Sequence, residues 1–197
     1  MKKYLVAFLA GYLVLLQQPA QAVLVNLGPK DCEEAITFGK THRATIEKEL
    51  DKHYSFGAAN EYSDNGTIHS KWYKLSLMAG YKAQRGEVIT LPEQSEILAD
   101  PFLQINITLY GQSLDFANGY QALLLQNGKE IKADKIHADY FMLQSPTQKP
   151  MSGFPVCRAV LRAYFKYELI DPSGSAVVVI KKDSKSVHLE VDFAKFR

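Results

Sequence analysis

The sequence has little cysteine: only Cys32 and Cys157 occur among 197 residues. Neither lies in a C-x-x-C motif or close to a histidine, so the reactive-thiol and zinc alternatives have no local support. In an exported protein, two cysteines most simply form one disulfide. We therefore expect a Cys32–Cys157 bond that ties the N-terminal part of the chain to the C-terminal part.

The sequence also lacks the common short catalytic motifs. It has no G-x-S-x-G elbow and no glycine-rich phosphate loop, so serine hydrolysis and nucleotide binding have no support. No two histidines have the i, i+4 spacing of a helical metal site. We therefore expect no metal and no cofactor, and we favour a protein that is not an enzyme. The five histidines are scattered along the chain: His42, His53, His69, His137 and His188.

Long hydrophobic runs are absent except at the start of the chain. Two lysines precede an apolar run over residues 4–16, and Ala20-Gln21-Ala22 has the small-x-small pattern that a signal peptidase reads. A retained anchor is disfavoured because this run is shorter than the ~20 residues that span a bilayer. We expect residues 1–22 to be a cleaved signal peptide of bacterial style. The mature chain is then periplasmic or secreted, without a transmembrane segment.

The expected mature chain has no excess charge of either sign. The leader holds two lysines and no acid, so 21 Lys and Arg remain against 21 Asp and Glu. Nucleic-acid binding needs a basic face or stripe, and a balanced chain gives it no support. We therefore expect no nucleic-acid partner.

Residues 23–100 have a mainly helical pattern. Apolar residues near helical spacing predict one helix over residues 32–53, with Asp31 as its capping residue and Gly39 as its weak point. A second helix is predicted over residues 92–99, because Pro92 suits the first turn of a helix.

The segment of residues 69–85 is ambiguous. Its apolar residues alternate as in a strand, but residues 70–85 contain no Val, Ile or Thr and are rich in helix-forming Lys, Leu and Ala. We favour a helix here, and a strand is the alternative.

From residue 101 onward the apolar period becomes two, which indicates strands. Asn127-Gly128 is a strong hairpin signal because both residues accept positive φ. A two-residue turn there pairs Leu124 with Ile131, so that the apolar side chains of the two arms share one face.

Near the C-terminus the same alternation continues. It predicts three strands over residues 159–169, 176–180 and 187–193, which tight turns would join into one antiparallel meander. We therefore expect an α+β fold in which the helices of residues 23–100 pack on an antiparallel β-sandwich of immunoglobulin-like type over residues 101–197.

One candidate binding surface follows from the register of the first of these strands. Arg162, Tyr164 and Lys166 fall opposite to the apolar residues Phe165 and Tyr167. Tyr164 therefore lies either under the helices or on an exposed face that combines aromatic and cationic groups. An aromatic ring with a polar tip suits such a binding face, although core packing accounts for most aromatic residues.

Three functions are compatible with this sequence. Our leading hypothesis is an exported, non-enzymatic binding or structural protein of the bacterial cell envelope, with an envelope protein as its partner. The alternative is a small-ligand carrier or an enzyme with its site between the helices and the sheet, and with residues 145–154 as a lid. The third is an accessory subunit that becomes ordered only with a partner.

Overall fold

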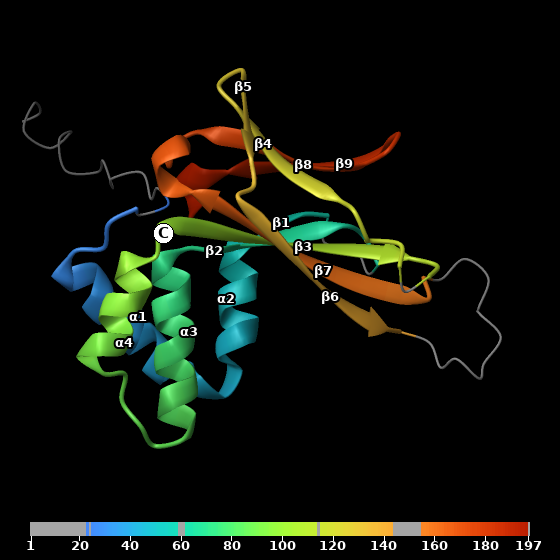
Figure 1. Cartoon of the computed structure of the whole chain (residues 1–197). Helices are drawn as coiled ribbons and strands as arrows, with labels where there is room; N and C mark the ends of the chain where they lie inside the picture. The colour runs from blue at the N-terminus through green and yellow to red at the C-terminus, as the bar shows by residue number, and fades with distance from the viewer. Residues whose placement is uncertain (1–22, 24, 59–61, 114, 144–154, 197) are drawn as a thin grey trace, which may run out of the picture.

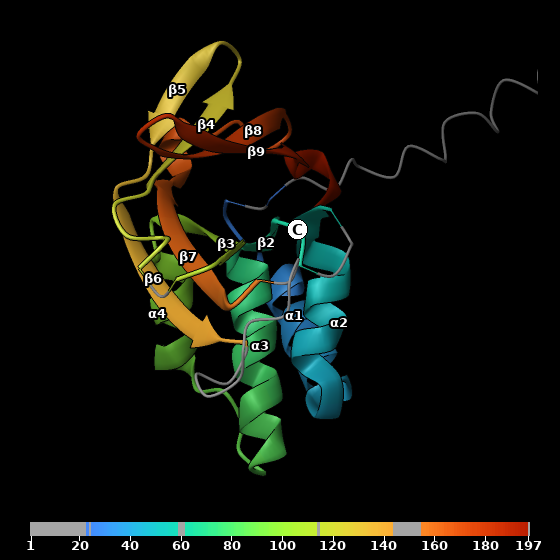
Figure 2. The ribbon, with the colours of Figure 1, turned by 90° about the vertical axis from the view of Figure 1, so that its right-hand side faces the viewer.

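The computed structural model describes residues 23, 25–58, 62–113, 115–143 and 155–196. The expected signal peptide (residues 1–22) and the expected lid (residues 145–154) lie outside these ranges. The described chain is a mixed α+β structure of four α-helices and nine strands in two antiparallel sheets. Figures 1 and 2 show the four-stranded sheet on one side of the five-stranded sheet and the helices on the other.

The five-stranded sheet has the order β1-β2-β3-β7-β6, and the four-stranded sheet has the order β5-β4-β8-β9. All neighbouring strands are antiparallel. The strands are β1 (Ser55–Gly57), β2 (Asn65–His69), β3 (Phe102–Gly111), β4 (Gln121–Gln126), β5 (Lys129–Lys132), β6 (Lys135–Met142), β7 (Cys157–Lys166), β8 (Ser175–Lys182) and β9 (Lys185–Asp192). The helices are α1 (Pro29–Thr41), α2 (Ile46–Tyr54), α3 (Lys71–Gln84) and α4 (Leu91–Ala99).

A single core joins the two sheets. Along β3, Leu103, Ile105 and Ile107 are fully buried, and they pair with Phe165, Ala163 and Leu161 of β7. Alternate strand residues share one face, so these side chains form the inner face of the five-stranded sheet. The four-stranded sheet adds its own buried side chains to the same core: Ala122, Leu124, Val178, Ile180, Leu189 and Val191.

The helix predicted over residues 32–53 is two helices. A short 3-10 turn over Arg43–Thr45 separates α1 from α2, and the Nδ1 atom of His42 lies 3.0 Å from the Phe38 carbonyl oxygen at the end of α1. Asp31 is inside the first turn, where its carboxylate accepts a hydrogen bond from the Gly28 amide at 2.9 Å. Helical spacing continues across such a break, so the sequence pattern does not reveal it.

Gly39 lies within α1 and does not end it. It is the point where α1 crosses α3 closely. A Cβ atom at this position would lie 2.2 Å from the backbone oxygen of Ser76 and 2.9 Å from the amide nitrogen of Gly80. The residue without a side chain therefore sets the distance between the two helices.

The ambiguous segment of residues 69–85 is mostly helical, as favoured, since α3 occupies most of it. Ser70 caps the helix by accepting a hydrogen bond from the Tyr73 amide at 3.2 Å. The predicted helix near the end of the segment 23–100 is also confirmed as α4, and Thr90 and Glu93 form its capping box. The sequence pattern missed β2, which pairs with β3 and so joins the parts on either side of residue 100 in one sheet.

The predicted hairpin is confirmed. Leu124 lies opposite Ile131, and Asn127 and Gly128 have φ angles of 51° and 73°. The second arm, β5, ends at Lys132, because the chain bends at Asp134 and continues as β6 in the five-stranded sheet.

The predicted three-strand meander is wrong. β8 and β9 form a hairpin, but β7 lies between β3 and β6 in the other sheet. A 3-10 turn over Tyr167–Leu169 and a turn closed by the Gly174 amide on the Asp171 carbonyl oxygen carry the chain from one sheet to the other. Alternation shows that a segment is a strand, but it does not say which strand is its neighbour.

The predicted disulfide is also wrong, because both cysteines are free thiols and they are not close together. Cys157 is the first residue of β7, where it lies opposite Gly111 of β3 and Met142 of β6. Cys32 is on α1, which packs against α3. Burial, with a smaller contribution from Asp31, raises the pKa of the Cys32 thiol. A smaller share of this thiol is therefore in the reactive thiolate form than for a cysteine in water.

Candidate functional site

The face of the five-stranded sheet opposite the core is polar across its width; we call it the outer face. One cross-strand row on it contains His69, Gln104, Tyr164 and Lys135 from β2, β3, β7 and β6. The next row contains Thr67, Asn106, Arg162 and His137. A sheet face with so many polar groups adds little to the apolar core, so its side chains are candidates for contacts with another molecule.

The sequence-predicted residues Arg162, Tyr164 and Lys166 all lie on this outer face. The side chains of Arg162 and Lys166 are 44% and 45% exposed, so they are accessible to a partner. Asp139 forms an ion pair with Arg162, and Asp134 lies 3.9 Å from the Lys166 ammonium. Exposed ion pairs of this kind contribute little stability, but they restrict the positions of the side chains.

Neighbouring aromatic and cationic groups hold Tyr164 in place. The Tyr164 ring lies edge-on to Phe102 at 6.5 Å and to His137 at 5.9 Å between ring centroids. The Lys135 ammonium lies 4.9 Å from the Tyr164 ring centroid and 5.0 Å from that of Phe102. Of the two placements that the sequence leaves open for Tyr164, the aromatic and cationic face is the one observed, and Tyr164 is half-buried there between exposed Arg162 and Lys166.

His69 marks the junction of this face with the helices. Its ring stacks on Tyr73 of α3 at 4.0 Å, and the Asn106 side-chain amide donates to its Nε2 atom at 3.0 Å. Burial, with smaller contributions from the positive charges of Lys74 and Arg162, lowers the pKa of His69 to about 3. His69 is therefore a neutral acceptor at physiological pH.

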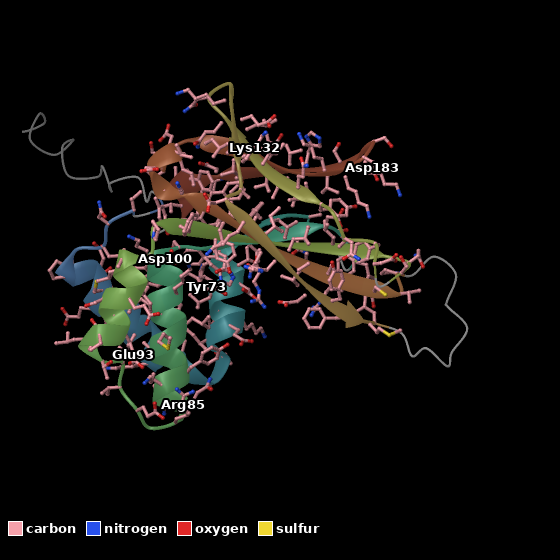
Figure 3. All side chains as sticks on the ribbon, in the orientation of Figure 1. Tyr73, Arg85, Glu93, Asp100, Lys132 and Asp183 are labelled. Atoms are coloured by element: carbon pink, nitrogen blue, oxygen red, sulfur yellow. The ribbon has the colours of Figure 1, made fainter. Side chains whose placement is uncertain are left out.

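Tyr73 links this junction to α2. Its hydroxyl donates to the Asp51 carboxylate at 3.2 Å, and Figure 3 shows Tyr73 where α3 meets the sheet. The pKa of Asp51 is raised, mainly by partial burial and also by the negative charge of Glu47. The hydrogen bond from Tyr73 offsets part of this rise in the pKa. One turn before Asp51 on α2, Glu47 accepts a hydrogen bond from the Tyr81 hydroxyl in the same manner. No local signal in the sequence relates Asp51 to His69 or to Arg162, so this cluster was not predicted.

Asp51 also lines a hollow of about 390 Å³ between α2 and the short edge strand β1. Ser55 and Asn65 add polar groups, and Lys52 adds a charge. These groups suit a small polar ligand, because carboxylate, hydroxyl and amide groups can bind hydroxyls or amines.

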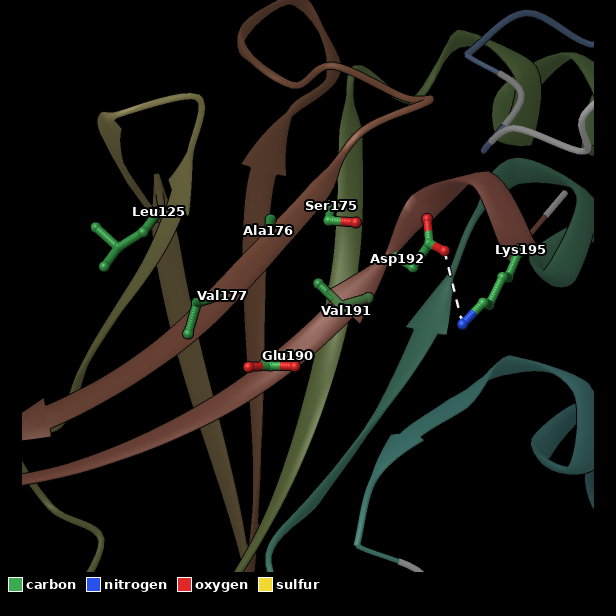
Figure 4. Close-up of a pocket in the computed structure, with 8 residues that line it drawn as sticks. All are labelled: Leu125, Ser175, Ala176, Val177, Glu190, Val191, Asp192 and Lys195. Carbon is green, nitrogen blue, oxygen red and sulfur yellow. Dashed lines mark ion pairs between the residues drawn. The ribbon is translucent and has the colours of Figure 1, made fainter.

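A hollow of about 560 Å³ lies on the four-stranded sheet (Figure 4). Leu125, Val177 and Glu190 form one cross-strand row in it, so its floor is apolar at one end and acidic at the other. The Asp192 carboxylate lies 3.6 Å from the Lys195 ammonium at its border. None of its lining residues belongs to the outer face of the five-stranded sheet.

Metal binding and membrane crossing both depend on features that can be sought among the described residues. No three His, Cys, Asp or Glu side chains in this part of the chain are placed to hold a metal ion. Within the same residues, no helix has both the length and the apolar character needed to cross a bilayer.

Searches against protein-family models, curated proteins and solved structures gave no match to this chain. Function therefore has to be argued from the site itself.

Proposed function

We propose that this chain is an exported, non-enzymatic binding protein of the bacterial cell envelope, and that the outer face of its five-stranded sheet binds an envelope protein. Export is inferred from the leader pattern of residues 1–22. The observation that carries the proposal is the position of Arg162, Tyr164 and Lys166 together on one polar face outside the core.

The chemistry of this surface favours a protein partner. Tyrosine and arginine supply a large share of the binding energy at protein interfaces, because each combines apolar area with hydrogen-bonding groups. Tyr164 is held between two rings and a cation, so little side-chain freedom remains to be lost on binding. Rigid strands also position these groups more accurately than loops do.

We further infer that the two sheets form a β-sandwich, since their apolar faces share one core. The immunoglobulin-like type stays a prediction. Whether or not the sandwich is of this type, the side chains of Arg162 and Lys166 stay accessible.

Site-specific photo-cross-linking in the intact cell tests this proposal. A photoreactive phenylalanine analogue replaces Tyr164 in one variant and Leu91 in a matched control, because Leu91 is 76% exposed but lies on α4. We expect one defined cross-linked protein from position 164, none from position 91, and loss of the product when Arg162→Glu is added. Equal products from both positions, or a product that survives Arg162→Glu, would contradict the proposal. N-terminal sequencing of the mature protein should begin at Val23.

A small-ligand carrier or an enzyme is the second candidate, favoured by the hollow beside Asp51. This site lies between a helix and the sheet, where such a function is expected. If it is correct, Asp51→Asn should weaken binding of a polyol or amine in a thermal-shift screen of such compounds. A screen in which the protein and the Asp51→Asn variant show the same shifts would remove this candidate.

A further inference from the structure

The four sheet edges of this molecule differ in how much unpaired backbone they offer. β1 and β5 are only three and four residues long. β9 lies beside β1, since a Cβ atom added to Gly57 of β1 would be 3.3 Å from the side chain of Leu189 on β9. β6 is eight residues long, and β7 is its only strand neighbour in the described part of the chain. A long edge strand can pair with a strand of another chain, so β6 is the edge to consider.

The hydrogen-bonding direction along β6 follows from β7. The Tyr167 amide donates to the Pro101 carbonyl oxygen, so the odd-numbered residues of β7 hydrogen-bond toward β3. Direction alternates along a strand, so the even-numbered residues of β7 bond toward β6, where Arg162 lies opposite His137. The even-numbered residues of β6 therefore direct their N–H and C=O groups away from β7: Ile136, Ala138, Tyr140 and Met142.

Two cations near the ends of β6 have no carboxylate partner among the described residues. Lys135 contacts only rings, those of Phe102 and Tyr164. The Arg158 guanidinium lies 4.6 Å from the ring centroid of Phe141, its partner on β6, and its buried Nε atom has no hydrogen-bond acceptor among the residues that the structure describes. The positive charge of Arg158 is not compensated by a described carboxylate, so it favours an anionic group of another molecule nearby.

The spacing of these cations sets the chemistry of such a molecule. Lys135 and the Arg158–Phe141 row are six residues apart along β6, or about 20 Å. Six is an even number, so two residues at this spacing in an added strand lie on the same face of it. That face continues the outer face, next to Tyr164 and Arg162.

We propose that the partner protein adds an extended strand antiparallel to β6, and that two acidic residues six positions apart in this strand pair with Lys135 and Arg158. This inference rests on the proposed function and names its binding mode. The main-chain groups of Ala138 and Tyr140 supply the ladder hydrogen bonds, and the two cations determine register and charge preference.

Amide hydrogen exchange with a synthetic peptide tests the proposal on the mature protein. The probe is a capped heptapeptide, Glu-Val-Thr-Val-Thr-Val-Glu, and its control carries Lys in place of both Glu residues. We expect saturating Glu peptide to slow exchange at the outward amides of Ala138 and Tyr140 at least tenfold, while the Lys peptide has no effect. Unchanged exchange at both amides, or equal slowing by both peptides, would overturn the proposal.

Ala138→Pro gives a second test because it removes an outward N–H without removing a bond to β7. Ala138→Ser is the matched control that keeps the N–H. The cross-linked product from position 164 should fall at least tenfold with the proline and stay unchanged with the serine. If the product survives the proline but not Arg162→Glu, strand addition is wrong and the proposed function stands. If it survives both, both fail; if the proline variant does not fold, the exchange measurement on the unaltered protein decides.

Discussion

The two faces of the five-stranded sheet are made by the same strands but have opposite compositions. On the inner face, Ile105 and Ile107 of β3 are completely buried. On the outer face, the alternate residues Asn106 and Thr108 are polar and only half-buried. Burial of apolar area stabilises a fold, whereas exposed polar groups contribute little net stability. The inner face therefore supplies most of the stability of this sheet, and the outer face is where we propose that a partner binds.

The largest expected effect comes from breaking the inner face. Ile107→Ala should lower the free energy of unfolding by about 2–5 kcal/mol, because it leaves a cavity between β3 and β7. Its neighbour Thr108→Ala, on the outer face, should change the same quantity by only about 0.5 kcal/mol. Urea denaturation measures both values. Equal losses would show that the outer face also belongs to the core.

A smaller effect concerns His69, a half-buried titratable group at the border of the outer face. The pKa of His69 is lowered from 6.5 to about 3, so an unfolded chain binds a proton at this residue below pH 6.5 while the folded chain does not. Stability should be fully present above pH 6.5 and lost as pH falls toward 3, by about 2–3 kcal/mol between pH 7 and pH 4.

The His69→Gln variant isolates this contribution, because Gln does not titrate and its amide oxygen can still accept from Asn106. Its unfolding free energy should depend less on pH over the same interval. Parallel pH profiles for the two proteins would mean that His69 is not protected from protonation by the fold.

The smallest expected effect is at the link between the outer face and α2. Tyr73→Phe removes the hydroxyl that donates to Asp51 and should cost about 0.5–1.5 kcal/mol. The stacking on His69 is retained because the ring is unchanged. Thermal denaturation at pH 7 checks this value, and a loss as large as that of Ile107→Ala would contradict a peripheral role for this link.

Local patterns predicted the inner face well and the neighbour relations poorly. The alternation in β3 and the Asn127-Gly128 turn are short-range signals, so β3 and the β4–β5 hairpin could be read from the sequence. The place of β7 between β3 and β6 depends on contacts between distant segments, which no local pattern contains. The same limitation explains the incorrect prediction of a Cys32–Cys157 disulfide, since the sequence does not give the distance between two cysteines in the fold.

The candidate site was predictable only along one strand. The register of β7 placed Arg162, Tyr164 and Lys166 on one face, because side chains alternate along any strand. His69, Asn106 and Lys135 come to the same face from other strands, and only the sheet order brings them together.

The central claim is that binding and stability reside on opposite faces of one sheet. The most direct test measures two quantities for Arg162→Ala: the yield of the cross-linked product from position 164 and the free energy of unfolding. We predict that the yield falls about tenfold, as for an interface residue worth about 1.4 kcal/mol, while the unfolding free energy changes by less than about 1 kcal/mol. An unchanged yield, or a yield that falls only in proportion to lost stability, would contradict the account.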